Sequence, residues 1–177
     1  MIEIKNIFKS FGSSEVLIDI TAKFERGKTN LIIGQSGSGK TVLLKCLLGL
    51  YATDKGELIY DNIYSSRMND EEKINIKREM GMVFQGSALF DSMTVLENVR
   101  FPLDMLTKYS DRKKNEIALK FIDRVNLNDA INKLPSEISG GMQKRVGIAR
   151  AIVLNPKYLF CDEPNSGLDP KTAIVID

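Results

Sequence analysis

The chain has 177 residues, 25 of them basic and 23 acidic, which gives a formal net charge of +2. A chain of this length can bury roughly 70% of its unfolded surface, enough for one sizeable core and a smaller lobe. The nearly balanced charge excludes the strong positive field that nucleic-acid-binding proteins present, so we expect no nucleic-acid partner.

Cysteine usage and hydropathy indicate in which cellular compartment the protein works. Cys46 and Cys161 lie inside apolar stretches of a chain without histidine, which disfavours a zinc site and a disulfide framework and predicts two buried, reduced thiols. No stretch reaches the roughly 18 to 20 apolar residues that a membrane span needs. Met1–Lys9 lacks the pattern of a signal peptide, so we expect a cytosolic protein that can still work at a membrane.

The first part of the chain predicts strands. Residues Ile2–Ile7 and Val16–Phe24 are β-branched or alternating and are separated by Gly12–Ser14, which predicts an antiparallel ribbon. We expect the ribbon to lead into a buried strand at Leu31–Ile33. Gly56–Tyr60 predicts a further strand.

After these strands the pattern becomes mainly helical. The apolar run Met80–Phe84 predicts one more buried strand, and the region from Gln85 to about Asn155 is then expected to be helical. Thr94 and Glu97 have the spacing of a capping box, in which each side chain satisfies the other residue's N–H group. Asp111–Val125 predicts a second helix in this region.

The last predicted helix, Gly140–Leu154, is followed by a short strand. Four apolar residues of the helix recur at steps of four, three and four and so form one face: Met142, Val146, Ala149 and Val153. Tyr158–Cys161 then predicts a fully buried strand.

The most specific pattern lies between the predicted strand Leu31–Ile33 and the apolar stretch Val42–Leu50. It is the P-loop pattern and consists of Gly34, Gln35, Ser36, Gly37, Ser38, Gly39, Lys40 and Thr41. The glycines let successive N–H groups point inward, and the helix that follows adds its positive end, so the loop is expected to bind polyphosphate. A flexible linker is the alternative, but a linker seldom lies between a strand pattern and a helix pattern.

The last two residues of the P-loop predict the rest of the contacts with a nucleotide. The ammonium group of Lys40 would reach the β- and γ-phosphates, and the hydroxyl of Thr41 would bind Mg²⁺. The sequence therefore predicts a nucleotide-binding protein.

Two carboxylates follow the predicted strand Tyr158–Cys161. Asp162 and Glu163 resemble the acidic strand end that lies beside the phosphate loop in P-loop nucleotidases. The resemblance implies that Asp162 binds Mg²⁺ and that Glu163 faces the attacking water, since one acid must stay with the metal while the other polarises water. Ordinary strand-end or helix-capping acids are the alternative.

A second candidate anion site begins the helix Gly140–Leu154. Ser139, Gly140, Gly141 and Met142 place one hydroxyl and several bare N–H groups at a helix N-terminus. A plain serine-capped helix is the alternative. Preceded by Ile138 and in order with the other motifs, the segment resembles the Leu-Ser-Gly-Gly-Gln signature of the ATP-binding-cassette (ABC) ATPases.

This resemblance extends from Ile2 to Asp169 and implies that the nucleotide is ATP. It implies that Ser139–Met142 closes on the γ-phosphate held by a second copy of the chain. Gln85 resembles the glutamine that touches Mg²⁺ or water, Phe11 the aromatic residue that stacks on adenine, and Asp169 an aspartate of the dimer interface. The alternatives are a neutral strand-end residue for Gln85, a core phenylalanine for Phe11 and a capped turn for Asp169.

The resemblance also implies the fold. We expect an α/β protein with a P-loop NTPase core, an N-terminal antiparallel β subdomain and an inserted helical subdomain. The expected segments are residues 1–85 for the nucleotide-binding core, 86–155 for the helical signature subdomain and 156–177 for the return to the core.

Two departures from the family pattern indicate a subgroup. Met142 replaces the common glutamine, Gly167 replaces a frequent alanine, and both, together with Phe84–Asp91, are similar to the ATPases of lipid transporters. That subgroup works with membrane permease subunits and a mammalian-cell-entry-type lipid-binding protein, on the inner, cytoplasmic face of the cell membrane. An ABC ATPase of DNA repair or translation is the alternative, although such proteins usually have tandem cassettes or long coiled-coil insertions.

The chain ends at Asp177, before the strand that carries the switch histidine in this family. We therefore expect a C-terminally truncated ATPase subunit with impaired hydrolysis and an exposed sheet edge that favours self-association. A module that binds ATP without hydrolysing it is the remaining alternative.

Overall fold

The computed structural model describes residues 1–162 and divides into two compact units. Met1–Lys77 form the first unit, and the second begins at Arg78, the last residue of α2 (Asp70–Arg78). Asn69 and Glu72 cap this helix reciprocally, each side chain accepting the other's backbone N–H at 2.9 Å. No residue of α2 is buried, so apolar periodicity could not reveal the helix.

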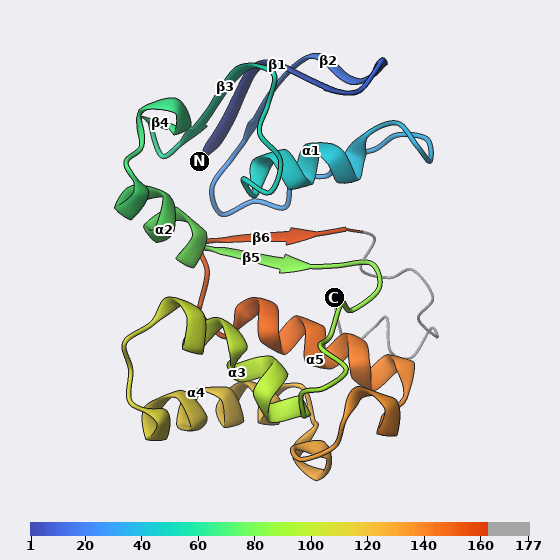
Figure 1. Ribbon diagram of the computed structural model, residues 1–177, viewed down its shortest axis with the longest axis vertical. Coiled ribbons are helices and arrows are strands. Elements are labelled where there is room, and N and C mark those ends of the chain that lie inside the picture. The colour runs from blue at the N-terminus through green and yellow to red at the C-terminus, as the bar shows by residue number, and fades with distance from the viewer. Residues whose placement is uncertain (163–177) are drawn as a thin grey trace. The chain divides into compact units, whose positions relative to one another are not determined.

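The first unit is built on a four-stranded antiparallel sheet with the strand order β2-β1-β3-β4 (Figure 1). Its strands are β1 (Ile2–Phe11), β2 (Ser14–Phe24), β3 (Lys55–Tyr60) and β4 (Ile63–Tyr64). In the hairpin of β1 and β2, Phe11 pairs with Ser14, and Gly12 turns the chain with a φ of 59°. The predicted ribbon and the strand at Gly56–Tyr60 are confirmed.

One helix, α1 (Lys40–Leu47), completes the core of this unit. Ile4 and Ile7 of β1 are fully buried, and the helix contributes Leu43, Leu44, Cys46 and Leu47. Tyr60 links the sheet to the helix, because its hydroxyl donates to the carbonyl oxygen of Leu47 at 2.5 Å. Burial raises the pKa of Tyr60, so the hydroxyl stays protonated as a donor.

The predicted buried strand at Leu31–Ile33 is wrong. Residues 29–35 have no regular secondary structure, and Leu31 and Ile33 are 78% and 85% exposed. Within residues 1–77, the four strands hydrogen-bond to one another and leave this run without a sheet partner. A short apolar run becomes a buried strand only where neighbouring strands accept its hydrogen bonds, which its own pattern cannot supply.

The second unit contains a parallel pair of strands and a group of helices. β5 (Met80–Val83) and β6 (Tyr158–Cys161) lie side by side and run in the same direction (Figure 1). The helices are α3 (Val95–Leu106), α4 (Asp111–Arg124) and α5 (Gly140–Ile152), with short 3-10 turns at Asn128–Ala130 and Pro135–Glu137. These elements confirm the predicted helices and the existence of both strands.

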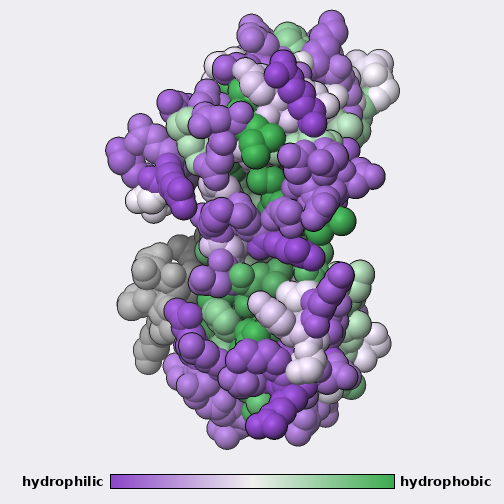
Figure 2. Space-filling view, turned by 90° about the vertical axis from the view of Figure 1, so that its left-hand side faces the viewer, coloured by the Kyte–Doolittle hydropathy of each residue, from purple (hydrophilic) through white to green (hydrophobic). Residues whose placement is uncertain are grey.

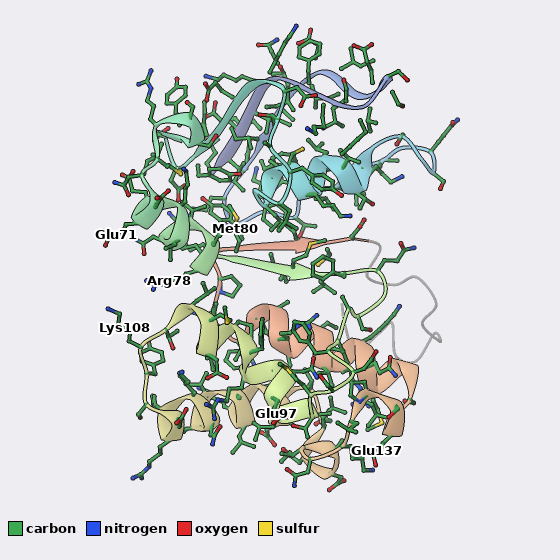
Figure 3. The ribbon with its side chains drawn as sticks, viewed as in Figure 1. Glu71, Arg78, Met80, Glu97, Lys108 and Glu137 are labelled. Atoms are coloured by element: carbon green, nitrogen blue, oxygen red, sulfur yellow. The ribbon has the colours of Figure 1, made fainter. Side chains whose placement is uncertain are left out.

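The predicted capping box opens α3. Thr94 Oγ1 accepts the N–H of Glu97 at 3.3 Å, and the carboxylate of Glu97 accepts the N–H of Thr94 at 2.7 Å. Glu97 is labelled at the start of this helix in Figure 3. The Thr94 hydroxyl also donates to the Glu97 carboxylate, at 2.8 Å, and the two bonds that this carboxylate accepts from Thr94 hold the pKa of Glu97 below its usual range.

The three helices share one apolar core. Val99 of α3, Ile122 of α4 and Val146 of α5 are fully buried in it. The apolar face predicted for the last helix is confirmed, with three buried members and one partly buried: Val146, Ala149, Val153 and Met142.

On the side of the molecule drawn in Figure 2, hydrophilic residues cover most of the surface. Among the described residues, no helix combines the length and apolarity that crossing a membrane requires.

The predicted full burial of β6 is wrong. Exposure alternates along the strand, so that Leu159 is 50% exposed and Cys161 is also exposed. Of the two cysteines, Cys46 alone is the buried thiol that we expected. In the described part of the chain β6 pairs with β5 alone, and a two-stranded sheet cannot cover both of its faces and edges.

Asn98 of α3 fixes the segment that precedes the helix. It is fully buried, its amide donates to the carbonyl oxygens of Phe90, Met93 and Thr94 at 2.9 to 3.1 Å, and its Oδ1 accepts the N–H of Phe90 at 2.9 Å. Asn98→Ala leaves these buried groups unpaired, so we expect the free energy of unfolding to fall by about 3 kcal/mol. Urea unfolding of the intact protein measures the change.

Asn115→Ala is the matched control, because Asn115 accepts a single hydrogen bond, from Arg100 at 2.8 Å. We expect it to lose less than about 1.5 kcal/mol. Equal losses in the two variants would contradict the role given to Asn98.

Candidate functional site

The P-loop (Gly34–Thr41) turns sharply and continues into α1. Gly37 and Gly39 have φ values of 79° and 90°, in the left-handed region that favours glycine. A Cβ atom on Gly39 would also lie 3.1 Å from the Cγ1 and the carbonyl oxygen of Val16. The left-handed turn therefore calls for glycine at position 39, and the close approach of β2 adds to this preference.

Lys40, the first residue of α1, folds back over the loop. Its ammonium group donates to the carbonyl oxygens of Gly34 at 2.9 Å and Gln35 at 2.8 Å. The first turn of α1 contains no acidic residue, so the ammonium and the N–H groups of the helix end form a positive site. Phosphate oxygens can replace the two carbonyls, because a charged oxygen is the stronger acceptor.

The hydroxyl residues of the loop lie around the same turn. The N–H of Ser38 donates to the carbonyl oxygen of Gln35 at 3.2 Å, and a Cβ on Gly34 would come within 2.7 Å of the Ser38 hydroxyl. Ser36 and Thr41 are exposed. The structure thus brings together all eight P-loop residues in the first unit.

A cavity of about 590 Å³ adjoins the loop in the first unit. Its lining includes Ser38, Gly39 and Lys40 as well as the segment Thr29–Ile33, of which Leu31–Ile33 are apolar. Phosphate needs donors, and the ammonium of Lys40 together with the N–H groups of the loop supplies them at one side of this cavity.

Phe11 lies at the end of β1 and is 44% exposed, so it is not the core phenylalanine that was its alternative. Its ring meets Tyr51 edge to face, with the centroids 5.3 Å apart, and the ammonium of Lys9 lies 5.3 Å from its centroid. Lys9 also donates to Asp54 at 2.7 Å, and this bond lowers the pKa of Asp54. The exposed ring is therefore held in place while keeping surface for a flat ligand.

Gln85 and Asp162 follow the two parallel strands of the second unit. Gln85 is exposed in the turn that follows β5, whereas Asp162 is buried just after β6, where its N–H donates to the carbonyl oxygen of Val83 at 3.0 Å. The carboxyl ends of parallel strands meet at one edge of a sheet, which is where open α/β folds bind ligands. The structure therefore brings these two predicted residues to one edge.

The signature segment (Ser139–Met142) forms the start of α5. Ser139 is the N-cap, and its hydroxyl accepts the N–H of Met142 at 3.3 Å. Ser139 and Gly140 are exposed, and the first turn of the helix contains no acidic residue. The serine cap by itself fits the alternative of an ordinary serine-capped helix, whereas the exposed positive helix end fits an anion site.

Two predicted site residues, Glu163 and Asp169, lie outside the described residues. Within residues 1–162, no three His, Cys, Asp or Glu side chains gather into a preformed metal site.

Arg150, Asn98 and Tyr51, the last of which contacts Phe11, are residues at this site that the sequence analysis missed. The guanidinium of Arg150 donates to the carbonyl oxygens of Ser87 and Ala88, close to Gln85. For Asn98 a signal was available, because it stands three residues after Val95, at a position where the core face of the helix requires an apolar residue. A single arginine near a helix end carries no comparable signal.

Comparison with known proteins identifies the relatives of this chain. The family model "ABC transporter" matches residues 17–166. The probable ribonucleotide transport ATP-binding protein mkl of Mycobacterium leprae is 41% identical over 169 residues, which are 96% of this chain and 49% of the relative. Protein TRIGALACTOSYLDIACYLGLYCEROL 3, chloroplastic, of Arabidopsis thaliana is 39% identical over 184 residues, covering 100% of this chain and 53% of the relative.

A solved structure agrees with the fold. The ATP-binding cassette MJ0796, in a dimeric post-hydrolysis state bound to ADP and Pi, superimposes with a TM-score of 0.89 at 34% identity, over 99% of this chain and 79% of that one. This similarity confirms the predicted α/β class with a P-loop NTPase core, an antiparallel β part and a helical part. The chain spans about half the length of the curated relatives.

A family model that covers most of the residues, relatives near 40% identity and a shared fold lead to one conclusion. The chain belongs to the ABC transporter family.

Proposed function

We propose that this chain binds ATP with Mg²⁺ and hydrolyses it as the nucleotide-binding subunit of an ABC transporter. The observation that carries the proposal is the contact of the Lys40 ammonium with the Gly34 and Gln35 carbonyls at the N-terminus of α1. That arrangement keeps a positive group inside a turn of backbone donors, ready for a triphosphate.

Each unit contributes part of the proposed chemistry. In the first unit, Lys40 and the loop N–H groups bind the β- and γ-phosphates, and Phe11 stacks on adenine. The proposed ligands of Mg²⁺ are Thr41, Gln85 and Asp162, a set of oxygen donors with one carboxylate that suits this ion when phosphates and water complete its shell. When bound, Mg²⁺ neutralises charge on the phosphate oxygens.

Glu163 is the proposed base. It follows Asp162 directly in the sequence, which allows one carboxylate to stay with the metal while the other orients and polarises water. Hydrolysis of a phosphoanhydride then depends on position and charge more than on covalent chemistry by the protein.

A second copy of the chain completes each proposed site. The signature segment offers Ser139 and the bare N–H groups of Gly140 and Gly141 to a γ-phosphate held by the other copy, and Asp169 is proposed for the interface. The dimeric state of the similar cassette bound to ADP and Pi supports this assembly. Closing and opening of the dimer would move membrane permease subunits through the segment Gln85–Phe101.

We propose a lipid as cargo, and a mammalian-cell-entry-type lipid-binding protein as a further partner. The support is the similarity of Met142, Gly167 and Phe84–Asp91 to lipid-transport ATPases, together with a relative named for trigalactosyldiacylglycerol. Another relative is named for ribonucleotide transport, so the cargo is a separate question from the chemistry. The proposed position is peripheral, on the cytoplasmic face of the cell membrane.

Lys40→Ala tests nucleotide binding. Loss of a charged contact with phosphate should weaken ATP affinity by about tenfold or more and abolish most hydrolysis. Fluorescent ATP titration and phosphate release measure the two effects. Lys45→Ala is the control, because Lys45 lies on the same helix but stacks over Tyr51, 5.4 Å from its ring centroid; equal effects would refute the role of Lys40.

Ser139→Ala tests the signature segment against a matched helix cap. Ser110 caps α4 as Ser139 caps α5, accepting the N–H of Lys113 at 3.4 Å. Both substitutions should cost about 1 kcal/mol of stability, but only Ser139→Ala should slow hydrolysis, by about ten- to a hundredfold. Thermal melting and steady-state ATPase assays of both variants check this, and similar turnover in the two would reject the second site.

Glu163→Gln tests the base. ATP binding should persist, turnover should fall by about a hundredfold or more, and an ATP-bound dimer should accumulate in size-exclusion chromatography. Glu116→Gln, on the exposed face of α4, is the control. Unchanged turnover in Glu163→Gln would remove this residue from the role, and binding without turnover in the unmodified protein would favour a non-hydrolysing ATP-binding module.

A further inference from the structure

The segment between Gln85 and the capping box of α3 has an unusual backbone. Ser87 and Ala88 are consecutive residues with φ values of 57° and 47°. Residues that carry a Cβ atom rarely adopt this left-handed backbone region, and such a conformation persists only where the surrounding structure fixes it. We call residues 85–94 the Gln85 loop.

Arg150 of α5 holds this bend. Its Nη1 donates to the carbonyl oxygen of Ala88 at 2.8 Å and its Nη2 to that of Ser87 at 2.7 Å, and its guanidinium lies 5.9 Å from the ring centroid of Phe90. Partial burial lowers the pKa of Arg150, but a guanidinium stays charged at physiological pH. Its planar fork bonds two successive carbonyls at once, which fixes their relative orientation.

Further contacts seat the loop between two helices. A Cβ on Gly147, one turn before Arg150, would lie 3.4 Å from the carbonyl oxygen of Ser87 and 3.6 Å from its Cα, so the loop backbone rests on α5. On the other side, Asn98 of α3 bonds both backbone groups of Phe90. The segment after Gln85 is thus attached to α5 through Arg150 and Gly147 and to α3 through Asn98.

The helix that Arg150 belongs to begins with the signature segment. α5 runs without a break over 13 residues from the Ser139 cap, a length of roughly 20 Å. Because an unbroken helix moves as one body, a displacement of the Gln85 loop also acts on the N-terminal end of α5. Arg150 stands between the two motifs, bonded to one and on the same helix as the other.

We propose that Arg150 is a positioning residue that couples the Gln85 loop to the signature segment during ATP hydrolysis. This inference rests on the proposed ATPase function. In that function Arg150 contacts neither the nucleotide nor the attacking water. Its guanidinium holds the Ser87–Ala88 bend against α5, so that movement of the Gln85 loop and movement of Ser139 stay linked.

The chain provides a matched control on the same helix. The Nη1 of Arg145 donates to the carbonyl oxygens of Val125 and Asn126 at 2.8 and 3.2 Å. It therefore bonds two successive carbonyls as Arg150 does, but in the turn after α4 and not in the Gln85 loop. A general effect of removing an arginine from α5 should appear in both variants.

The first experiment measures steady-state ATP hydrolysis by the intact protein with its membrane subunits. Arg150→Ala should lower kcat by about ten- to a hundredfold, as small misplacements do, while the KM for ATP changes by less than about threefold. Arg150→Lys, in which the ammonium is a single point donor, should have a kcat between those of the unmodified protein and Arg150→Ala. Arg145→Ala should keep kcat within about threefold of the unmodified protein.

The second experiment measures hydrogen exchange of backbone amides in the same proteins without nucleotide. Arg150→Ala should speed exchange by about tenfold or more across the Gln85 loop, whereas Arg145→Ala should speed it near Val125 instead. Ala88→Gly in the Arg150→Ala background should restore part of kcat, since glycine adopts the left-handed bend without strain.

The outcomes separate this inference from the function on which it rests. An unmodified protein that hydrolyses no ATP ends the proposed function. Turnover in the unmodified protein with equal kcat in Arg150→Ala and Arg145→Ala overturns the role of Arg150 alone, as does a loss of kcat without faster exchange in the Gln85 loop or without recovery by Ala88→Gly.

Discussion

The turn at Gly34–Gly39 is the constraint on which the site depends. Lys40 can reach the carbonyl oxygens of Gly34 and Gln35 only because the chain reverses within six residues, and the reversal needs left-handed φ values at Gly37 and Gly39. The sheet of the first unit contributes directly, since a Cβ atom on Gly39 would lie 3.1 Å from Val16 of β2, closer than an ordinary van der Waals contact. The geometry proposed to bind phosphate is therefore a property of backbone and packing, to which one ammonium group adds charge.

The sequence could predict those elements whose cause is local. The hairpin at Gly12, the capping box of Thr94 and Glu97 and the apolar face of α5 all follow from neighbouring residues, and all were confirmed. The run Leu31–Ile33 is as apolar as Met80–Val83, yet only the second is a strand. The difference lies in the hydrogen-bonded partner that β6 gives to β5, and a partner more than seventy residues away along the chain leaves no local signal.

The same limit applies to the site. Glycine, serine and lysine of the P-loop could be predicted, because phosphate binding demands those residue types at fixed spacing. Arg150 could not, because its partners are backbone carbonyls 62 and 63 positions away along the chain, and any residue type offers a carbonyl. Tyr51 was missed for a similar reason, since its contact with Phe11 depends on how the turn after α1 meets β1.

The first turns of the helices differ in their charge. In α2, α3 and α4 the helix end is neutralised by its own acidic residues, Asp70, Glu97 and Asp111 among them. In α1 and α5 the first turn has none, and glycine or serine stands at the cap. The chain thus leaves positive helix ends without acidic neighbours where the P-loop ends and where the signature segment begins. Exposed dipoles of this kind contribute little to the stability of the free protein, and they become favourable when an anion supplies the missing charge. In the proposed dimer, a polyphosphate held by α1 of one copy and α5 of the other would therefore favour the bound state over the free one.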